Sequence, residues 1–138
     1  MKPILTLILA LLPAAVAGQT IPSDGLMLDD FLWQKRPVVV FADSPEDPAF
    51  RTQMDYIARD LAALEDRDVV VITDTDPAGD SDVRRQLRPR GFSVVILDKD
   101  GEVKLRKPLP WHVREIVRAI DKFPLRRQEI EDRFPGRS

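Results

Sequence analysis

The side chains best suited to hold a ligand form a run of carboxylates between residues 74 and 82. Four of them have the spacing of calcium ligands, at the first, third, seventh and ninth positions of a loop: Asp74, Asp76, Asp80 and Asp82. Gly79 stands at the sixth position, as in such loops. However, Ala78 lacks the oxygen that the fifth position needs, and Arg85 puts a cation where the bidentate glutamate belongs. We therefore predict a solvated loop whose aspartates cap helices, with weak calcium binding as the alternative.

Residues for nucleophilic or acid–base chemistry are few. The chain contains no cysteine, so it has no thiolate for redox or covalent chemistry and no disulfide. Its one histidine, His112, follows Trp111 at the start of a predicted helix, and the spacing shows no partners for a triad or a metal cluster. No glycine-rich phosphate loop is present. We predict that His112 is structural or exposed, and we predict no catalytic residue, no metal ligand and no cofactor.

The charge balance limits the classes of partner. Lys and Arg number 21, Asp and Glu number 23, and the formal net charge is −2 at pH 7. Such a charge gives no long-range attraction for nucleic acid or an anionic membrane. Acidic residues alternate with a group of basic residues toward the C-terminus. The basic residues are Arg114, Arg118, Lys122, Arg126 and Arg127. The pattern predicts ion pairs along solvated helices. The alternative is a basic patch, flanked by Trp33 and Trp111, that meets an acidic partner or an anionic ligand.

The N-terminus has the pattern of a cleavable signal peptide. Lys2 supplies a positive charge, Ile4 to Leu12 form an apolar run, and Ala15 to Ala17 offer the small residues that signal peptidase reads. The run is shorter than the ~20 apolar residues of a permanent membrane span, so we expect no membrane span. The chain therefore divides into three parts: a signal peptide over 1–17, a flexible arm over 18–25, and one domain over 26–138. We expect that domain to be exported to the periplasm or the medium.

Two apolar segments predict central strands. Pro37 to Ala42 and Val69 to Ile72 are apolar and mostly β-branched at consecutive positions, as in strands buried on both faces. Between them, apolar residues recur every three or four positions from Phe50 to Leu61, which indicates a helix with one apolar stripe. Ser44 is predicted to cap this helix, with Pro45 in its first turn. Strand, helix and strand in this order form a right-handed parallel crossover.

The second half of the chain predicts a hairpin and further helices. Phe92 to Leu97 has the composition of a strand, and a turn at Asp98 to Gly101 leads to an alternating, half-exposed edge strand around Val103 and Leu105. Helices are predicted over three ranges: 81–87, 113–120 and 125–133. The predicted class is therefore α/β, with βαβ followed by ββα in a mixed sheet with flanking helices. This is the element order of thioredoxin-like folds.

Three segments carry a family resemblance: Trp33 to Ala42; Gly91 and Phe92, leading into Asp98 to Lys104; and Ile120 to Glu129. Together they resemble the DUF4174 family, and the Arg-Arg-Gln-Glu sequence that ends the third segment is the most specific part. The resemblance implies a peroxiredoxin-like fold in a small exported protein and implies no established activity. In that fold the reactive cysteine stands at the first turn of the helix after the first strand. This chain has Ser44 to Ala49 there instead.

The resemblance also implies a functional face at the start of that helix and in the loops beside it. Here the face comprises residues 44–47 and 88–92, which we predict to form a mixed-charge cleft for a peptide or small polar group. The candidate binding residues are Ser44, Asp47, Arg88, Arg90 and Trp33, the last of which is also expected to cover the core.

The leading hypothesis is non-catalytic binding of an envelope or extracellular protein or peptide. One alternative is an oxidoreductase-related enzyme with a non-thiol site. The other is a structural or metal-buffering protein that uses the loop over 74–82.

Overall fold

The computed structural model describes residues 20–135 and contains one five-stranded sheet in the order β1-β3-β2-β4-β5. The predicted signal peptide lies outside these residues. The strands are β1 Thr20–Pro22, β2 Arg36–Phe41, β3 Val69–Asp74, β4 Ser93–Leu97 and β5 Val103–Lys107. β1, β3 and β2 run parallel, whereas β4 is antiparallel to β2 and β5 is antiparallel to β4. The predicted mixed sheet, parallel crossover and edge strand are confirmed.

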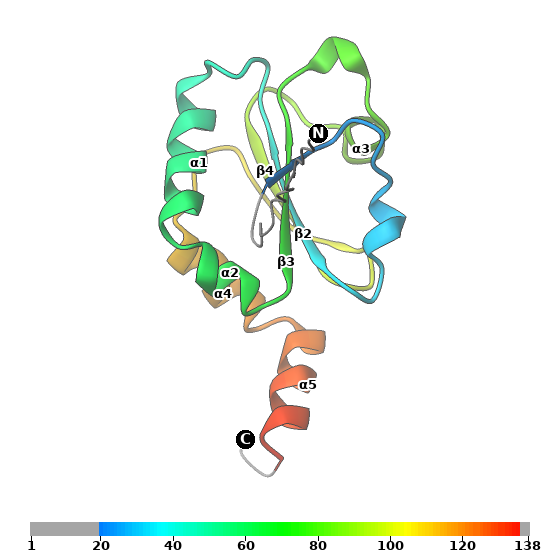
Figure 1. Cartoon of the computed structure of the whole chain (residues 1–138), viewed down its shortest axis with the longest axis vertical. Coiled ribbons are helices and arrows are strands. Elements are labelled where there is room, and N and C mark those ends of the chain that lie inside the picture. The colour runs from blue at the N-terminus through cyan, green and yellow to red at the C-terminus, as the bar shows by residue number, and fades with distance from the viewer. Residues whose placement is uncertain (1–19, 136–138) are drawn as a thin grey trace, which may run out of the picture.

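Helices cover both faces of this sheet. The α-helices are α1 Pro48–Arg59, α2 Leu61–Glu65, α3 Asp82–Leu87, α4 Val113–Ile120 and α5 Pro124–Arg133, and two 3₁₀ turns are η1 Leu28–Phe31 and η2 Pro77–Gly79. α1, α2 and α4 lie on one face, η1 and α3 lie on the other, and α5 extends beyond one end of the sheet (Figure 1). None of the helices described here is long and apolar enough to cross a membrane.

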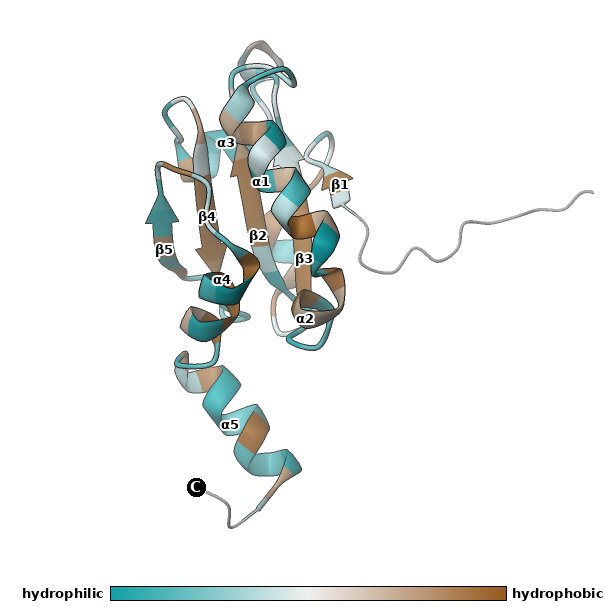
Figure 2. Ribbon diagram, turned by 90° about the vertical axis from the view of Figure 1, so that its left-hand side faces the viewer, coloured by the Kyte–Doolittle hydropathy of each residue, from teal (hydrophilic) through white to brown (hydrophobic). Residues whose placement is uncertain are grey.

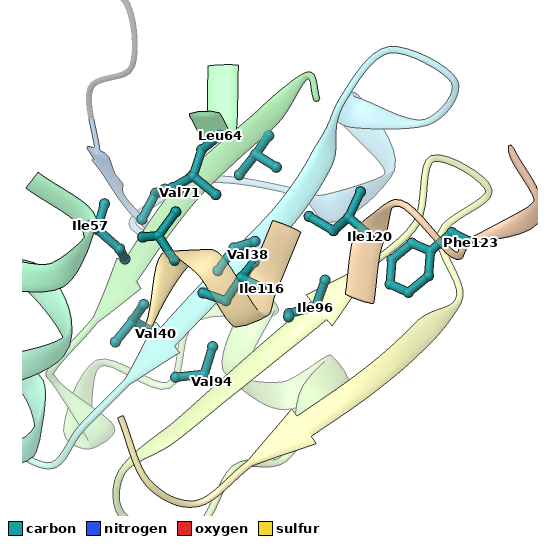
Figure 3. Packing of buried hydrophobic residues seen from close by; sticks show 12 residues of the cluster. Val38, Val40, Ile57, Leu64, Val71, Val94, Ile96, Ile116, Ile120 and Phe123 are labelled. Atoms are coloured by element: carbon teal, nitrogen blue, oxygen red, sulfur yellow. The ribbon is translucent and has the colours of Figure 1, made fainter. Parts of the chain in front are cut away.

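β2 is the middle strand of the sheet, and all six of its residues are buried. Successive side chains of a strand point to opposite faces. Val38 and Val40 accordingly pack with α1, α2 and α4, where Figure 3 shows them beside Ile116, while Val39 and Phe41 pack with η1 and α3. The central strands are the most hydrophobic part of the ribbon in Figure 2. The prediction of burial on both faces is confirmed for this strand.

The start of α1 differs from the prediction. The Asp47 carboxylate, and not Ser44, caps the helix by accepting the Ala49 N–H at 2.8 Å, and Pro48 is the first helical residue. The Ser44 carbonyl accepts the Asp47 N–H at 3.3 Å in a turn before the helix. Because the sequence contains Ser-Pro and then Asp-Pro three residues later, it offers two possible starts. The chain uses the second, and Ser44 is left in the connection.

Two further predictions were wrong. Thr20–Pro22, within the predicted arm, is strand β1 and pairs with Val71–Thr73, because the outer edge of β3 offers main-chain partners that no local pattern reveals. Trp33 does not cover the core, since 66% of its surface is exposed. Leu28 of η1 occupies the core position there, and Trp33 lies in a turn with a φ of 62°.

Candidate functional site

The sheet brings four of the five predicted binding residues to one end. Ser44 and Asp47 follow β2, and Arg88 and Arg90 precede β4, whose first residue pairs with the last residue of β2. Trp33 precedes β2 and therefore lies toward the other end of that strand, which is about 20 Å long. The five residues cannot form a single site.

A groove of about 320 Å³ adjoins Arg88 and Arg90, and we call it the cationic groove. It is lined by Arg88, Pro89, Arg90, Phe92, Ser93, Arg106, Lys107 and Pro108. Its second wall is the end of β5, because the antiparallel register sets Lys107 opposite Val94, next to the start of β4. Among the described residues, Asp47 forms no ion pair with Arg88 or Arg90. The lining of this groove is thus cationic and does not include the start of α1.

Three of the cations that line the groove are unpaired within the part of the chain that the structure describes. Arg88, Arg90 and Arg106 are exposed, and within residues 20–135 none of them forms an ion pair or a side-chain hydrogen bond. Lys107 packs its ammonium 4.6 Å from the centre of the Trp111 ring. Arg88 also has a left-handed backbone with a φ of 50° at the end of α3, a position that favours glycine. Guanidinium groups with free N–H donors can bind carboxylates in a bidentate manner.

A second hollow, of about 480 Å³, lies where β1 and β3 end. Asp74 forms its inner wall and is 5% exposed. Its carboxylate accepts hydrogen bonds from Ser23 at 2.7 Å, from Ser81 at 2.6 Å and from Arg84 at 2.8 Å. Burial by itself raises the pKa of Asp74, but these hydrogen bonds lower it below its usual range. Asp74 therefore acts as a connector between β3, α3 and the segment after β1.

The contacts within the loop over 74–82 bear on the alternative that this loop binds calcium. Asp74 is engaged by protein donors, and Arg85 forms ion pairs with both Asp80 and Asp82. Ser81 caps α3, and Asp76 makes no side-chain cap bond to η2, so the prediction that aspartates of this loop cap the helices was wrong. Within residues 20–135, no group of three or more carboxylate or imidazole side chains is placed to hold a metal ion. The loop is built from internal charge pairs.

Charges are also buried at the opposite end of the sheet, around Arg36 at the start of β2. Its guanidinium is fully buried and donates to Asp98 at 2.8 Å and to the Arg67 carbonyl at 3.0 Å. It also binds both carboxylate oxygens of Glu129 in α5, at 3.2 and 3.0 Å. Lys99 links Glu129 to Asp68, at 2.9 and 2.8 Å. We call this group, together with Arg126 and Asp121, the ionic cluster.

Arg126 and Asp121 connect the base of α5 to the rest of the cluster. Arg126 is 4% exposed and donates to Glu129 at 3.3 Å and to Asp121 at 3.4 Å. Arg67 binds both oxygens of Asp121, each at 2.9 Å. The prediction that Arg126 belongs to a solvated helix face was wrong, because α5 packs this residue against the end of the sheet. The prediction of ion pairs along α4 was wrong as well. Among the described residues, the exposed cations Arg114 and Arg118 of α4 and Lys122 in the turn after it form no ion pair.

The ionic cluster favours the charged forms of Glu129 and Lys99. Burial by itself raises the pKa of Glu129, but hydrogen bonds from Arg36 and Lys99 outweigh it and lower the pKa to about 2. Burial lowers the pKa of Lys99, yet its bonds to Asp68 and Glu129 raise it above its usual value. The cluster holds the base of α5 by ion pairs between its own side chains.

The three sequence segments singled out above meet in this cluster. The first contributes Arg36, the second Asp98 and Lys99, and the third Asp121, Arg126 and Glu129. The family model for DUF4174, a domain of unknown function, matches residues 27–129, and this range includes all six of these residues. The chain belongs to this family. The part of the motif that propensity leaves unexplained, Arg-Arg-Gln-Glu, supplies the buried Arg126 and the partly buried Glu129 to the cluster.

Solved structures place the DUF4174 domain among thioredoxin-like folds. A chloroplastic thioredoxin z is 18% identical with a TM-score of 0.57, over 79% of this chain and all of that one. The reduced 2-Cys peroxiredoxin of Plasmodium vivax is 14% identical with a TM-score of 0.55, over 73% of this chain and 83% of that one. Prx1a of Plasmodium yoelii is 15% identical with a TM-score of 0.54, over 80% and 83%. At these identities the likeness establishes the fold, and the predicted thioredoxin-like class is confirmed.

This DUF4174 domain lacks the residue that carries out peroxiredoxin chemistry. It has no cysteine, and the first turn of α1 carries Asp47 and Pro48, so it has no thiol for peroxiredoxin chemistry. His112 stacks on Tyr56 with ring centres 4.0 Å apart.

The sequence analysis did not identify Arg106 and Lys107 as groove residues, although it predicted the edge strand that contains them. Only the register between β4 and β5 places them beside Arg90.

Proposed function

We propose that this DUF4174 domain binds an acidic segment of an envelope or extracellular protein or peptide, without catalysing a reaction. The observation that supports it is the cationic groove, in which three arginines have no partner within residues 20–135. The expected location rests on the signal-peptide pattern of residues 1–17.

Charge favours a short acidic segment over a large polyanion. The whole chain has a formal net charge of −2, so a polyanion experiences little attraction at long range. At the groove itself, Arg88, Arg90 and Arg106 present planar donors around the apolar surfaces of Phe92 and Pro108. Paired hydrogen bonds to carboxylates then provide the specificity that net charge does not.

Fluorescence anisotropy with two labelled peptides tests the proposal, one of about ten glutamates and one of about ten lysines. We expect the glutamate peptide to bind and the lysine peptide not to bind. The double variant Arg88→Gly, Arg106→Gln should bind the glutamate peptide about tenfold more weakly, equivalent to about 1.4 kcal/mol. Arg88→Gly removes a charge where glycine suits the backbone, so the fold should be retained.

Arg114→Gln is the matched control, because Arg114 is an exposed cation that does not line the groove. It should leave the affinity within about twofold of the parent protein. Equal binding of both peptides, or an equal loss in the control and the double variant, would overturn the proposal.

A further inference from the structure

A second groove, between β5 and α4, has an apolar floor. It has a volume of about 510 Å³, and its floor is formed by Leu105, Trp111, Ala119 and Phe123. We call it the apolar groove. Leu105, Trp111 and Phe123 also pack against the core beneath α1 and α4, so this floor is held by the body of the domain. Its size suits one large apolar side chain.

The rim of the apolar groove is mostly cationic. Lys104, Arg118 and Lys122 stand around the floor, together with a single acidic residue, Glu115. Arg118 and Lys122 form no ion pair within residues 20–135, whereas Lys104 pairs with Glu102 at 3.1 Å. Charge complementarity therefore favours an apolar side chain whose neighbours in the partner are acidic.

The two grooves meet on one strand. Lys104 and Leu105 line the apolar groove, the next two residues of β5 line the cationic groove, and the Lys107–Trp111 contact joins them. β5 is the last strand of the sheet, and its outer edge has no neighbouring strand among the described residues. An extended segment lying along this edge can thus reach both grooves. The two pairs of residues are about 7 Å apart along the strand, or roughly two residues of the ligand.

We propose that the apolar groove binds a large apolar side chain of the same acidic segment, about two residues from its carboxylates. This inference rests on the proposed function above and specifies its ligand as an acidic peptide with an apolar anchor. A second copy of this chain is disfavoured as the occupant at the strand edge, because Lys104, Arg106 and Lys107 would oppose the same cations of the other copy.

Two labelled peptides that differ at a single position test the inference. Both carry a block of glutamates and one glycine, followed by phenylalanine in one peptide and serine in the other. We expect the phenylalanine peptide to bind about tenfold more tightly. Ala119→Trp fills the groove, so it should abolish this difference while leaving the affinity for the serine peptide unchanged. Ala58→Trp, at an exposed alanine on α1, is the control and should preserve the difference.

A direct contact measurement keeps the test valid if Ala119→Trp fails to fold. In Trp33→Ser protein, Trp111 is the only tryptophan, and a peptide with 4-nitrophenylalanine as its anchor should quench its emission. The serine peptide should not. If the serine peptide binds but the anchor adds neither affinity nor quenching, the apolar groove inference fails alone. If neither peptide binds, the proposed function fails with it.

Discussion

At the scale of single residues, the least expected feature is a fully buried arginine at the start of the central strand. Removing a guanidinium from water is costly and is tolerated only when its charge and donors are matched. Arg36 satisfies this condition through Asp98 and Glu129. Trp33, three residues earlier, is a large apolar side chain left in solvent. An estimate of the stability contribution from residue type alone would therefore be wrong for both positions.

We expect Arg36→Met to destabilise the fold by about 3–5 kcal/mol, because it leaves Asp98 buried without its partner. Trp33→Ser should change the free energy of unfolding by less than about 0.5 kcal/mol. Urea denaturation of both variants measures the two values. Similar losses in the two variants would contradict this assignment.

The pH dependence of stability should reveal Glu129. Its pKa is about 2 in the fold against a usual value of 4.5, so the charged form is stabilised by folding. The contribution is fully present above about pH 5 and is lost as the pH falls through 4.5 toward 2, by an amount on the order of 3 kcal/mol. Glu129→Gln should be less stable at pH 7 and should show a shallower decline between these pH values. Parallel declines in denaturation series of both proteins would contradict the assignment.

At the scale of elements, the helix starts and strand ends determine what the surface presents. α1 begins at Asp47 and Pro48, which leaves Ser44 in the connection after β2. β5 ends where Arg106 and Lys107 face the loop before β4. The base of α5 is held through the ionic cluster and not through a large apolar face. Each of these elements is short, so a single capping or charge contact matters for its position.

Asp47→Ala should cost about 1 kcal/mol, because it removes the side-chain acceptor for the Ala49 N–H. Ser44→Ala should cost less than about 0.5 kcal/mol, since Ser44 is not the cap. Thermal unfolding monitored by circular dichroism compares the two. A greater loss from Ser44→Ala would restore the original prediction for the cap.

At the scale of the whole molecule, the two ends of the sheet have different roles. One end gathers the connections after β2, β3 and β5, and it carries the cationic groove. The other end holds α5 through buried charges, and Figure 1 shows α5 extending beyond it. The residues of the cationic groove therefore lie at the end of the sheet away from the ionic cluster.

Activity assays test the alternative hypothesis of an oxidoreductase-related enzyme. With no cysteine in the chain, we expect neither peroxide reduction nor disulfide exchange above the buffer background. Peroxide consumption and insulin reduction, each with a thiol reductant, measure these activities. Sustained turnover by the purified protein would establish a non-thiol site and displace the binding proposal.

The sequence by itself determined the fold class and the order of the strands from β2 to β5, but not strand β1. Consecutive β-branched residues in 37–42 and 69–72 require burial on two faces, and the stripe from Phe50 to Leu61 needs a sheet to cover. These are local properties, because hydrophobic periodicity records which face of an element is buried. The absence of a thiol is equally plain from the sequence. The starts of short elements were less certain, as the competing Ser44 and Asp47 caps show.

Only the tertiary structure decided which charges meet. Arg36 finds Glu129 across 93 positions of the chain, and Arg90 shares a groove with Arg106 through the register of an antiparallel pair. A charged residue has the same sequence signature whether it is solvated, buried in a cluster or left unpaired at a groove. What distinguishes these states is the distance to its partners and the water around it, and both arise only when the elements pack together.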